Sequence, residues 1–163
     1  VYTSNWQMLF RQKLGLNVFQ DDDIHLIERL LQAMHDSKVD YTYFFRQLAQ
    51  VRQSQNLQSI HLRNYFVDRE AIDQWFSDYI LRLKSENSDD DTRQIEMNLV
   101  NPKYILRNHL AQIAIEKAIQ HDFSEIKRLH ELLSKPYDEQ VEFEAYAMPP
   151  PPDLERVEVS CSS

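Results

Sequence analysis

Glycine is almost missing from this chain: Gly15 is its single glycine in 163 residues, where average usage would give roughly eleven. Glycine adopts positive φ angles at low steric cost, so tight turns, strand bulges and phosphate-binding loops draw on it. A chain with one glycine has few such turns and no glycine-rich phosphate loop. We therefore expect helices joined by short polar links, in an all-α fold.

The composition is typical of a globular domain. Hydrophobic residues make up 42% of the chain and charged residues 27%, which is enough for a core. The net charge of −8 argues against nucleic acid or an anionic membrane as a partner, because both require clustered Lys and Arg. No apolar run approaches the roughly twenty residues of a membrane span. The single cysteine, Cys161, excludes an internal disulfide framework, and we expect a cytoplasmic protein.

Apolar residues at helical spacing predict six helices. These are residues 4–14, a helix opened by Asp21–Asp23, a helix capped by Asp40, residues 69–84 behind a cap at Asp68, residues 102 to about 120, and residues 123 to before Pro136. Asn101 and Pro102 are predicted to open the 102–120 helix as its N-cap and first residue. Its broad apolar face predicts a central, buried helix. The polar break at 85–91 predicts a mobile loop.

The main core is expected to form from two of these helices. Its predicted members are Trp75, Phe76, Tyr79, Leu83, Leu106, Leu110 and Ile113. From Tyr137 onward the periodicity fails, and the run Pro149–Pro152 must be extended. The sequence thus predicts an irregular multi-helix domain over residues 1–136 and an extended Pro-rich C-terminal tail over residues 137–163, which carries Cys161. The start of the chain, Val1–Ser4, has no initiator Met and no signal segment, which is typical of a cut inside a longer protein.

No motif predicts a catalytic, cofactor-binding or metal-binding residue. Asp21–Asp23 and Asp89–Asp91 lack the glycine and glutamate positions of an EF-hand loop. The first cluster is better explained as carboxylates at a helix N-terminus, and the second as a solvated loop. The six histidines lack zinc-ligand spacing, and HExxH, CxxC and GxSxG patterns are absent. His121–Ser124 lacks the glycine of the magnesium-binding Asp-Phe-Gly motif and predicts a capped helix junction.

Cys161 is the one chemically active side chain that stands out as a candidate. A cysteine near a flexible terminus is usually inert, although its exposure makes it reactive. A thiol at the end of an otherwise cysteine-free chain can also reach a partner thiol in sequence outside this chain. Both interpretations stay open, and Cys161 is the redox candidate.

Several stretches, taken in order, resemble the SelO/YdiU family. They are Asn101–Asn108, Leu110–Gln112, Ala114–Ala118, Asp122–Ser124, Pro136–Gln140 and Ser160–Ser163. The resemblance is strongest over residues 101–163. Residues 1–100 agree mainly in helical character and in details such as Trp6 and Phe44-Phe45. Because so many matches occur in order, they are more specific than any short motif.

The resemblance implies a parent protein of pseudokinase fold that transfers AMP from ATP to protein hydroxyl groups, with Mg²⁺ or Mn²⁺. The family's nucleotide loop and its catalytic and metal-binding residues lie in the earlier part of its chains, and none has a matching position here. This chain then has no catalytic, cofactor or metal residue of its own. Its partners are the missing N-terminal kinase-like part and the protein substrates of the parent. Some members carry selenocysteine third from the C-terminus, where this chain has Cys161.

A different class of protein is the alternative: a free-standing helical interaction module with no enzymatic parent. In that case the aromatic stripes form a groove for a partner. The coding sequence immediately upstream of Val1 separates the two interpretations. A glycine-rich loop and a strand lysine there would support the family, whereas an initiator Met just before Val1 would support the module.

We predict that Cys161 is a redox handle on the parent enzyme rather than a nucleophile in AMP transfer. An extended tail spans up to about 3.3 Å per residue, so oxidation can join Cys161 to a cysteine upstream of Val1 and tether the tail. Mass spectrometry of the oxidised full-length protein should detect that disulfide, and Cys161→Ser should abolish the response of activity to reductant. An unchanged reductant response in Cys161→Ser would show that the thiol is passive.

Overall fold

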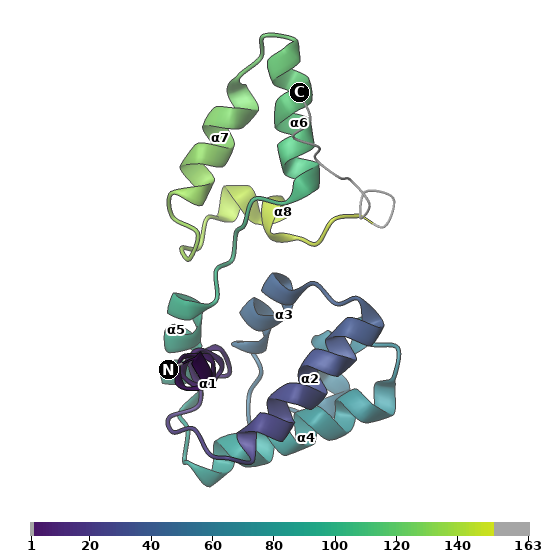
Figure 1. Cartoon of the computed structure of the whole chain (residues 1–163), viewed down its shortest axis with the longest axis vertical. Helices are drawn as coiled ribbons and strands as arrows, with labels where there is room; N and C mark the ends of the chain where they lie inside the picture. The colour runs from purple at the N-terminus through teal and green to yellow at the C-terminus, as the bar shows by residue number, and fades with distance from the viewer. Residues whose placement is uncertain (1, 152–163) are drawn as a thin grey trace. The chain divides into compact units, whose positions relative to one another are not determined.

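The computed structural model describes residues 2–151, with side chains from Asn5 onward. Cys161 and most of the Pro-rich tail lie outside the described residues. Within them the chain forms helices and no strand, which confirms the all-α prediction (Figure 1). The elements are α1 (Tyr2–Lys13), α2 (Asp23–Ser37), α3 (Tyr41–Leu48), η1 (Leu57–Ser59), η2 (His61–Tyr65), α4 (Arg69–Ser85), α5 (Asp90–Val100), α6 (Asn108–Ile119), α7 (Ser124–Leu133), η3 (Val141–Phe143) and α8 (Glu144–Ala147).

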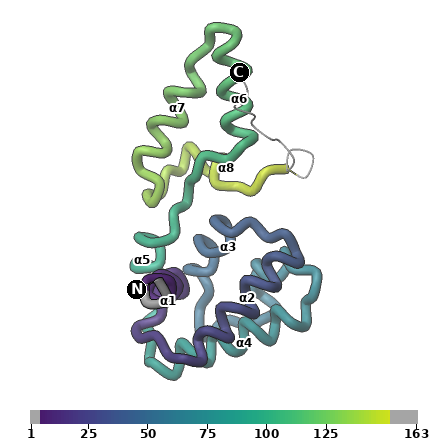
Figure 2. Tube along the Cα trace, in the orientation of Figure 1, coloured from purple at the N-terminus to yellow at the C-terminus, as the bar shows by residue number. Residues whose placement is uncertain are grey.

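The chain divides into two compact units, Val1–Asn101 and Pro102–Ser163. Figure 2 traces the backbone of the helices in each unit. Each unit has buried hydrophobic residues of its own. The division lies at 101/102, whereas the sequence predicted a helical domain that continued to residue 136.

The core of the first unit forms where α2 packs against α4 (Figure 1). The Trp75 ring stacks on the Tyr79 ring with centroids 5.1 Å apart, and the indole N–H donates to the Leu26 carbonyl at 2.8 Å. The Tyr79 hydroxyl donates to the Leu14 carbonyl at 2.8 Å. Burial raises the pKa of Tyr79 to about 12, so it stays a neutral donor. The predicted core face of α4 is buried as expected, and its polar atoms have partners.

A buried arginine fixes α5 to this core. The Arg93 guanidinium donates to the Val51 carbonyl, to the Tyr79 hydroxyl at 3.3 Å and to the Asp90 carboxylate at 3.0 Å. Arg93 is only 2% exposed. A buried charge is costly unless it is paired and hydrogen-bonded, so these contacts are what allow α5 to pack in this position.

The prediction that Asn101 and Pro102 open a helix is wrong. Asn101 instead ends α5, with its N–H bonded to the Met97 carbonyl at 2.8 Å. Its side-chain amide donates to the Lys13 carbonyl at 3.0 Å and accepts from the Lys13 ammonium at 3.1 Å. The Arg46 guanidinium bonds to the Asn101 carbonyl at 3.0 Å. Contacts from residues far away in the sequence therefore decide the conformation of Asn101.

The segment after Pro102 is not helical, and α6 begins only at Asn108. The backbone N–H groups of Lys103 and Tyr104 both donate to the Pro136 carbonyl, at 2.8 and 3.1 Å. These two bonds join the segment after Pro102 to the segment that follows α7. Where the sequence predicted the first turns of a helix, the chain is non-helical and bonds to the Pro136 carbonyl.

The break between α4 and α5 is shorter than the predicted 85–91 loop. Asp89 is the N-cap of α5, and its carboxylate accepts the Thr92 N–H at 2.9 Å. The Gln53 side-chain amide donates to the Ser88 carbonyl at 2.6 Å. Asp90 and Asp91 are therefore the first residues of a helix rather than part of a loop.

In the second unit, α6 and α7 form a helical hairpin (Figure 1). Leu110, Ala114 and Leu129 are buried in it, but Leu106 is 56% and Ile113 is 38% exposed. The prediction that this helix is central and belongs to the main core with Trp75 is therefore wrong. A helix in a two-helix hairpin can bury only part of a broad apolar face, and the rest remains at the surface.

Residues 137–148 differ from the predicted extended tail. They include η3 and α8, and Ala147 is buried. The Lys103 ammonium bonds to Glu139 at 2.6 Å and to Glu144 at 2.5 Å. The Tyr146 hydroxyl donates to Glu125 at 2.6 Å. These polar contacts hold the segment in the second unit, and hydrophobic periodicity does not report them.

Gly15 lies just beyond α1 at a φ of +66°, where a Cβ atom would be 2.5 Å from Arg93 Cγ and 2.7 Å from Met97 Sδ. Both the backbone angle and the close approach of α5 require glycine there. Elsewhere in the described residues, positive φ occurs at non-glycine residues, including Lys38 after α2 (52°) and His121 after α6 (61°). At these positions, residues other than glycine therefore adopt the left-handed backbone conformation.

We predict that Gly15→Ala and Lys38→Gly change stability in opposite directions. Gly15→Ala should lower the free energy of unfolding by about 1–3 kcal/mol, because it overpacks the contact with α5 at a left-handed angle. Lys38→Gly should raise it by up to about 1 kcal/mol, because glycine relieves the left-handed strain at a helix C-cap. Urea unfolding of the variants measures both values. Equal effects of the two substitutions would contradict the close packing at Gly15.

Candidate functional site

The first acidic cluster is part of the helix framework. Asp23 is 1% exposed, and its carboxylate accepts the Gln20 N–H at 2.7 Å. The Arg82 guanidinium lies 2.7 Å from the same carboxylate. This confirms the interpretation of the cluster as carboxylates at a helix N-terminus.

The second acidic cluster opens α5, and its carboxylates have separate partners. The Thr92 backbone N–H holds the pKa of the Asp89 carboxyl below its ordinary value. Asp90 accepts the Gln53 N–H at 3.0 Å, and Asp91 bonds to Arg52 at 2.6 Å. Across residues 2–151, no group of three or more His, Cys, Asp or Glu side chains is arranged to hold a metal ion.

The histidines are not brought together into a site either. They are His25, His35, His61, His109, His121 and His130. Burial, together with the charge of Arg107, lowers the pKa of His109. His121 occupies the turn between α6 and α7, where the Asp122 carboxylate accepts the Ser124 N–H at 2.9 Å. The helix junction predicted at His121–Ser124 is confirmed, although the N-cap residue of α7 is Phe123, which makes no side-chain cap bond. The redox candidate Cys161 lies outside the described residues.

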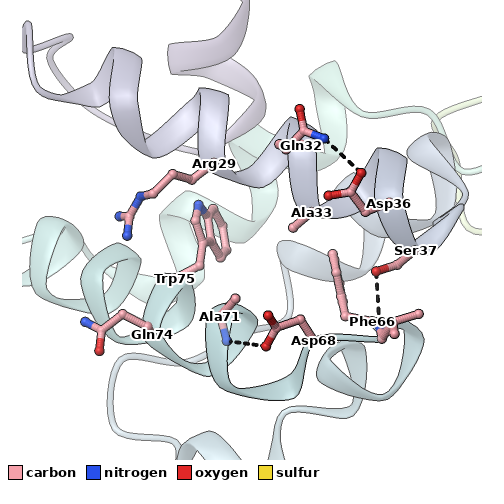
Figure 3. A pocket seen from close by; sticks show the side chains of 11 residues that line it. Arg29, Gln32, Ala33, Asp36, Ser37, Phe66, Asp68, Ala71, Gln74 and Trp75 are labelled. Carbon is pink, nitrogen blue, oxygen red and sulfur yellow. Dashed lines mark hydrogen bonds between the residues drawn. The ribbon is translucent and has the colours of Figure 1, made fainter.

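A cavity of about 430 Å³ opens beside α2 and α4, close to the segment from Phe66 to Asp68. Figure 3 shows the Trp75 side chain at its centre, with Ala33 of α2 and Ala71 of α4 beside it. Its lining is mainly apolar, with polar side chains around the rim. The cavity is large enough for a small ligand. Whether it could bind a polar ligand depends on whether its polar side chains are free to form hydrogen bonds with that ligand.

The polar groups at the cavity rim bond to one another, to the backbone or to the nearby Asp78 of α4. Arg29 bonds to Asp78 at 2.6 Å. The Gln32 amide donates to Asp36 at 2.8 Å, and the Asp68 carboxylate caps α4 by accepting the Ala71 N–H at 2.9 Å. These groups already have partners within the chain, so their roles are structural. They do not point together into the cavity as the polar groups of a substrate site would.

The second unit has an apolar groove of about 550 Å³ along the α6–α7 hairpin. We call it the α6–α7 groove. It is lined by Leu106, Ala111, Ala114, Ile115, Ala118, Ile119, Ile126, Leu129, His130 and Leu133. Ile119 is 74% and Ile126 is 45% exposed. This surface was not predicted from the sequence, because the apolar face of the 102–120 segment was expected to be buried core.

The alternative of a helical interaction module predicted a partner groove formed by aromatic stripes, and the α6–α7 groove is not that surface. The aromatic stripe of α4 is buried, with Trp75 at 2% and Tyr79 at 0% exposure. It therefore offers no surface to a partner. The exposed apolar side chains are mostly aliphatic and lie at positions of α6 and α7 that repeat every three or four residues. That spacing, visible in the sequence, could have identified the groove.

None of the helices in the described part of the chain combines the length and apolar character needed to cross a bilayer.

Comparison with known proteins gives a consistent family match. The family model of "Protein adenylyltransferase SelO" matches residues 1–134. A "Protein nucleotidyltransferase YdiU" from Herminiimonas arsenicoxydans is 50% identical over 162 residues, which is 99% of this chain and 32% of that protein. Proteins of the same description from Burkholderia cenocepacia and Burkholderia multivorans are 48% identical over 94% of this chain and 29% of their own length. The chain thus spans about a third of the length of the curated relatives it matches.

We predict that two carboxylates on the cavity rim contribute unequally to stability. Asp68→Ala should lower the free energy of unfolding by about 1 kcal/mol, because it removes the N-cap of α4. Asp36→Ala is the matched control and should cost less than about 0.5 kcal/mol, since its bond to Gln32 is on an exposed helix surface. Thermal melts of the two variants give the comparison. A larger loss for Asp36→Ala would show that the rim has a role other than capping.

Proposed function

The chain belongs to the family of protein adenylyltransferase SelO, and we propose that it is the C-terminal helical portion of a longer enzyme that transfers AMP from ATP to Ser, Thr or Tyr hydroxyl groups of proteins. The observation that carries this proposal is the extent of the match. Relatives described as protein nucleotidyltransferases align with 94–99% of this chain but with 29–32% of their own length. The rest of the enzyme, including its kinase-like part, lies outside these 163 residues.

The helix N-termini of this chain support the proposal that the nucleotide site lies elsewhere in the parent. Phosphates bind where a helix N-terminus offers free N–H groups and a positive dipole end. In α3, α4 and α5 that end carries the carboxylate of Asp40, Asp68 or Asp89, each bonded to an N–H of the first turn. A carboxylate there both uses a donor and repels a phosphate.

The buried cations are also committed to structure. Arg46 donates to the Asn98 carbonyl at 3.0 Å, and Arg93 donates to the Val51 carbonyl. Lys103 is held between two carboxylates of its own unit. A triphosphate and its divalent ion need cations and carboxylates that converge on one cavity. The described residues do not fit ATP with Mg²⁺ or Mn²⁺, and the proposal assigns both to the missing part of the parent.

The role proposed for these 163 residues is therefore structural: they extend and brace the C-terminal part of the enzyme. Their polar network serves cohesion, with long-range bonds such as that between Lys13 and Asn101. Protein substrates and the N-terminal kinase-like part are the partners of the parent under this proposal.

We predict that the 163-residue chain alone neither binds ATP nor transfers AMP, whereas the full-length parent does both. Calorimetric titration with ATP and magnesium should give no heat of binding for the chain. Transfer of labelled AMP to protein should occur only with the full-length enzyme. A micromolar ATP site in the isolated chain, or an inactive full-length parent, would refute the proposal.

A further inference from the structure

The α6–α7 groove is a large apolar surface that the described residues of the second unit leave open. Leu106 is 56%, Ile119 is 74% and Ile126 is 45% exposed. Contiguous apolar surface of this kind is rare on a soluble protein unless it binds something. The net charge of −8 and the aliphatic lining argue against an anionic occupant such as a phospholipid surface.

The arrangement of the lining matches the outline of one helix. On α6 the positions are 111, 114, 115 and 118, with 119 beside them, and on α7 they are 126, 129, 130 and 133. Both sets follow the i, i+3, i+4, i+7 pattern of a helical stripe. The α6 set includes three alanines, Ala111, Ala114 and Ala118, whose short side chains allow a partner helix to approach closely. Two such stripes side by side form a trough into which the apolar face of an amphipathic helix fits.

We propose that the α6–α7 groove binds an amphipathic helix from the part of the parent enzyme that precedes residue 1. This inference rests on the proposed function. The curated relatives are about three times as long as this chain, which covers 29–32% of them, so most of the parent is available to supply the helix. A segment of the same polypeptide acts at an effective concentration that reaches millimolar values for short flexible linkers. Intramolecular docking is therefore favoured over a second copy of the chain.

The first experiment identifies the occupant in the full-length parent. Ile119→p-benzoylphenylalanine and Ile115→p-benzoylphenylalanine place a photoreactive group in the groove. The matched control is Leu81→p-benzoylphenylalanine, at a position of α4 that is 60% exposed and outside the groove. After irradiation, peptide mapping should find positions 119 and 115 joined to one segment upstream of residue 1, within a single polypeptide, and position 81 not joined to it.

Other crosslinking results would overturn the inference. A crosslink between two polypeptides would make the occupant a second copy. A crosslink to residues 1–163 of the same polypeptide would make it another part of this chain. The absence of any crosslink from positions 119 and 115 in the folded parent would show the groove to be open to solvent.

The second experiment measures whether the groove is covered without introducing a bulky group. Ile119→Glu should lower the melting temperature of the full-length parent, because it places a charge in an apolar interface. Leu81→Glu is the control and should cause a smaller shift. Equal shifts for the two variants would contradict the inference. Transfer of labelled AMP is measured separately: an upstream crosslink in an inactive parent refutes only the proposed function, and an active parent with a crosslink to a second copy refutes only the groove assignment.

Discussion

The guanidinium group of Arg93 joins three parts of residues 1–101 that are separated in sequence. It bonds to the carbonyl of Val51 and to the hydroxyl of Tyr79, and the same hydroxyl donates to the carbonyl of Leu14 at the end of α1. Because a buried charge is costly unless it is paired and hydrogen-bonded, these bonds of the two terminal nitrogens of Arg93 couple the positions of α1, α4 and α5. The need for glycine at position 15 follows from the same packing, since Arg93 Cγ occupies the space of a Cβ there.

Features set by neighbouring residues could be predicted from the sequence, and features set by distant ones could not. Asp40 and Asp68 cap α3 and α4 as expected, because a carboxylate reaches an N–H only three residues away. Asn101 followed by proline has the same local pattern as a helix start. Its side chain instead bonds to Lys13, 88 residues away. This tertiary contact outweighs the preference of the Asn-Pro dipeptide for a helix start. Local preference decides a conformation only where no tertiary contact competes for the same hydrogen-bonding groups, as Lys13 does for the Asn101 side-chain oxygen.

The candidate surface shows a different limit of sequence reasoning. Periodicity correctly marked the apolar face that includes Leu110, Ala114 and Ala118, but it does not state what covers such a face. This chain spans about a third of the length of its curated relatives. In it, α7 covers one part of the apolar face of α6, and the other part is exposed. The catalytic chemistry was not predicted within the chain, and the described polar groups are used for caps, ion pairs and bonds to carbonyl groups. Cys161 remains a prediction, since it lies outside the described residues.

The contact between Lys13 and Asn101 also has a consequence for the order of folding during synthesis. The two residues are 88 positions apart, so α1 leaves the ribosome long before Asn101 exists. At typical elongation rates of 5–20 residues per second, that interval is on the order of ten seconds. In the second unit, the bonds of Glu125 to Lys117 and Tyr146 join residues only 8 and 21 positions apart, and short-range contacts form quickly. The bond between α1 and Asn101 thus forms only when the last residue of the first unit appears, whereas the hairpin that follows closes almost as soon as it is synthesised.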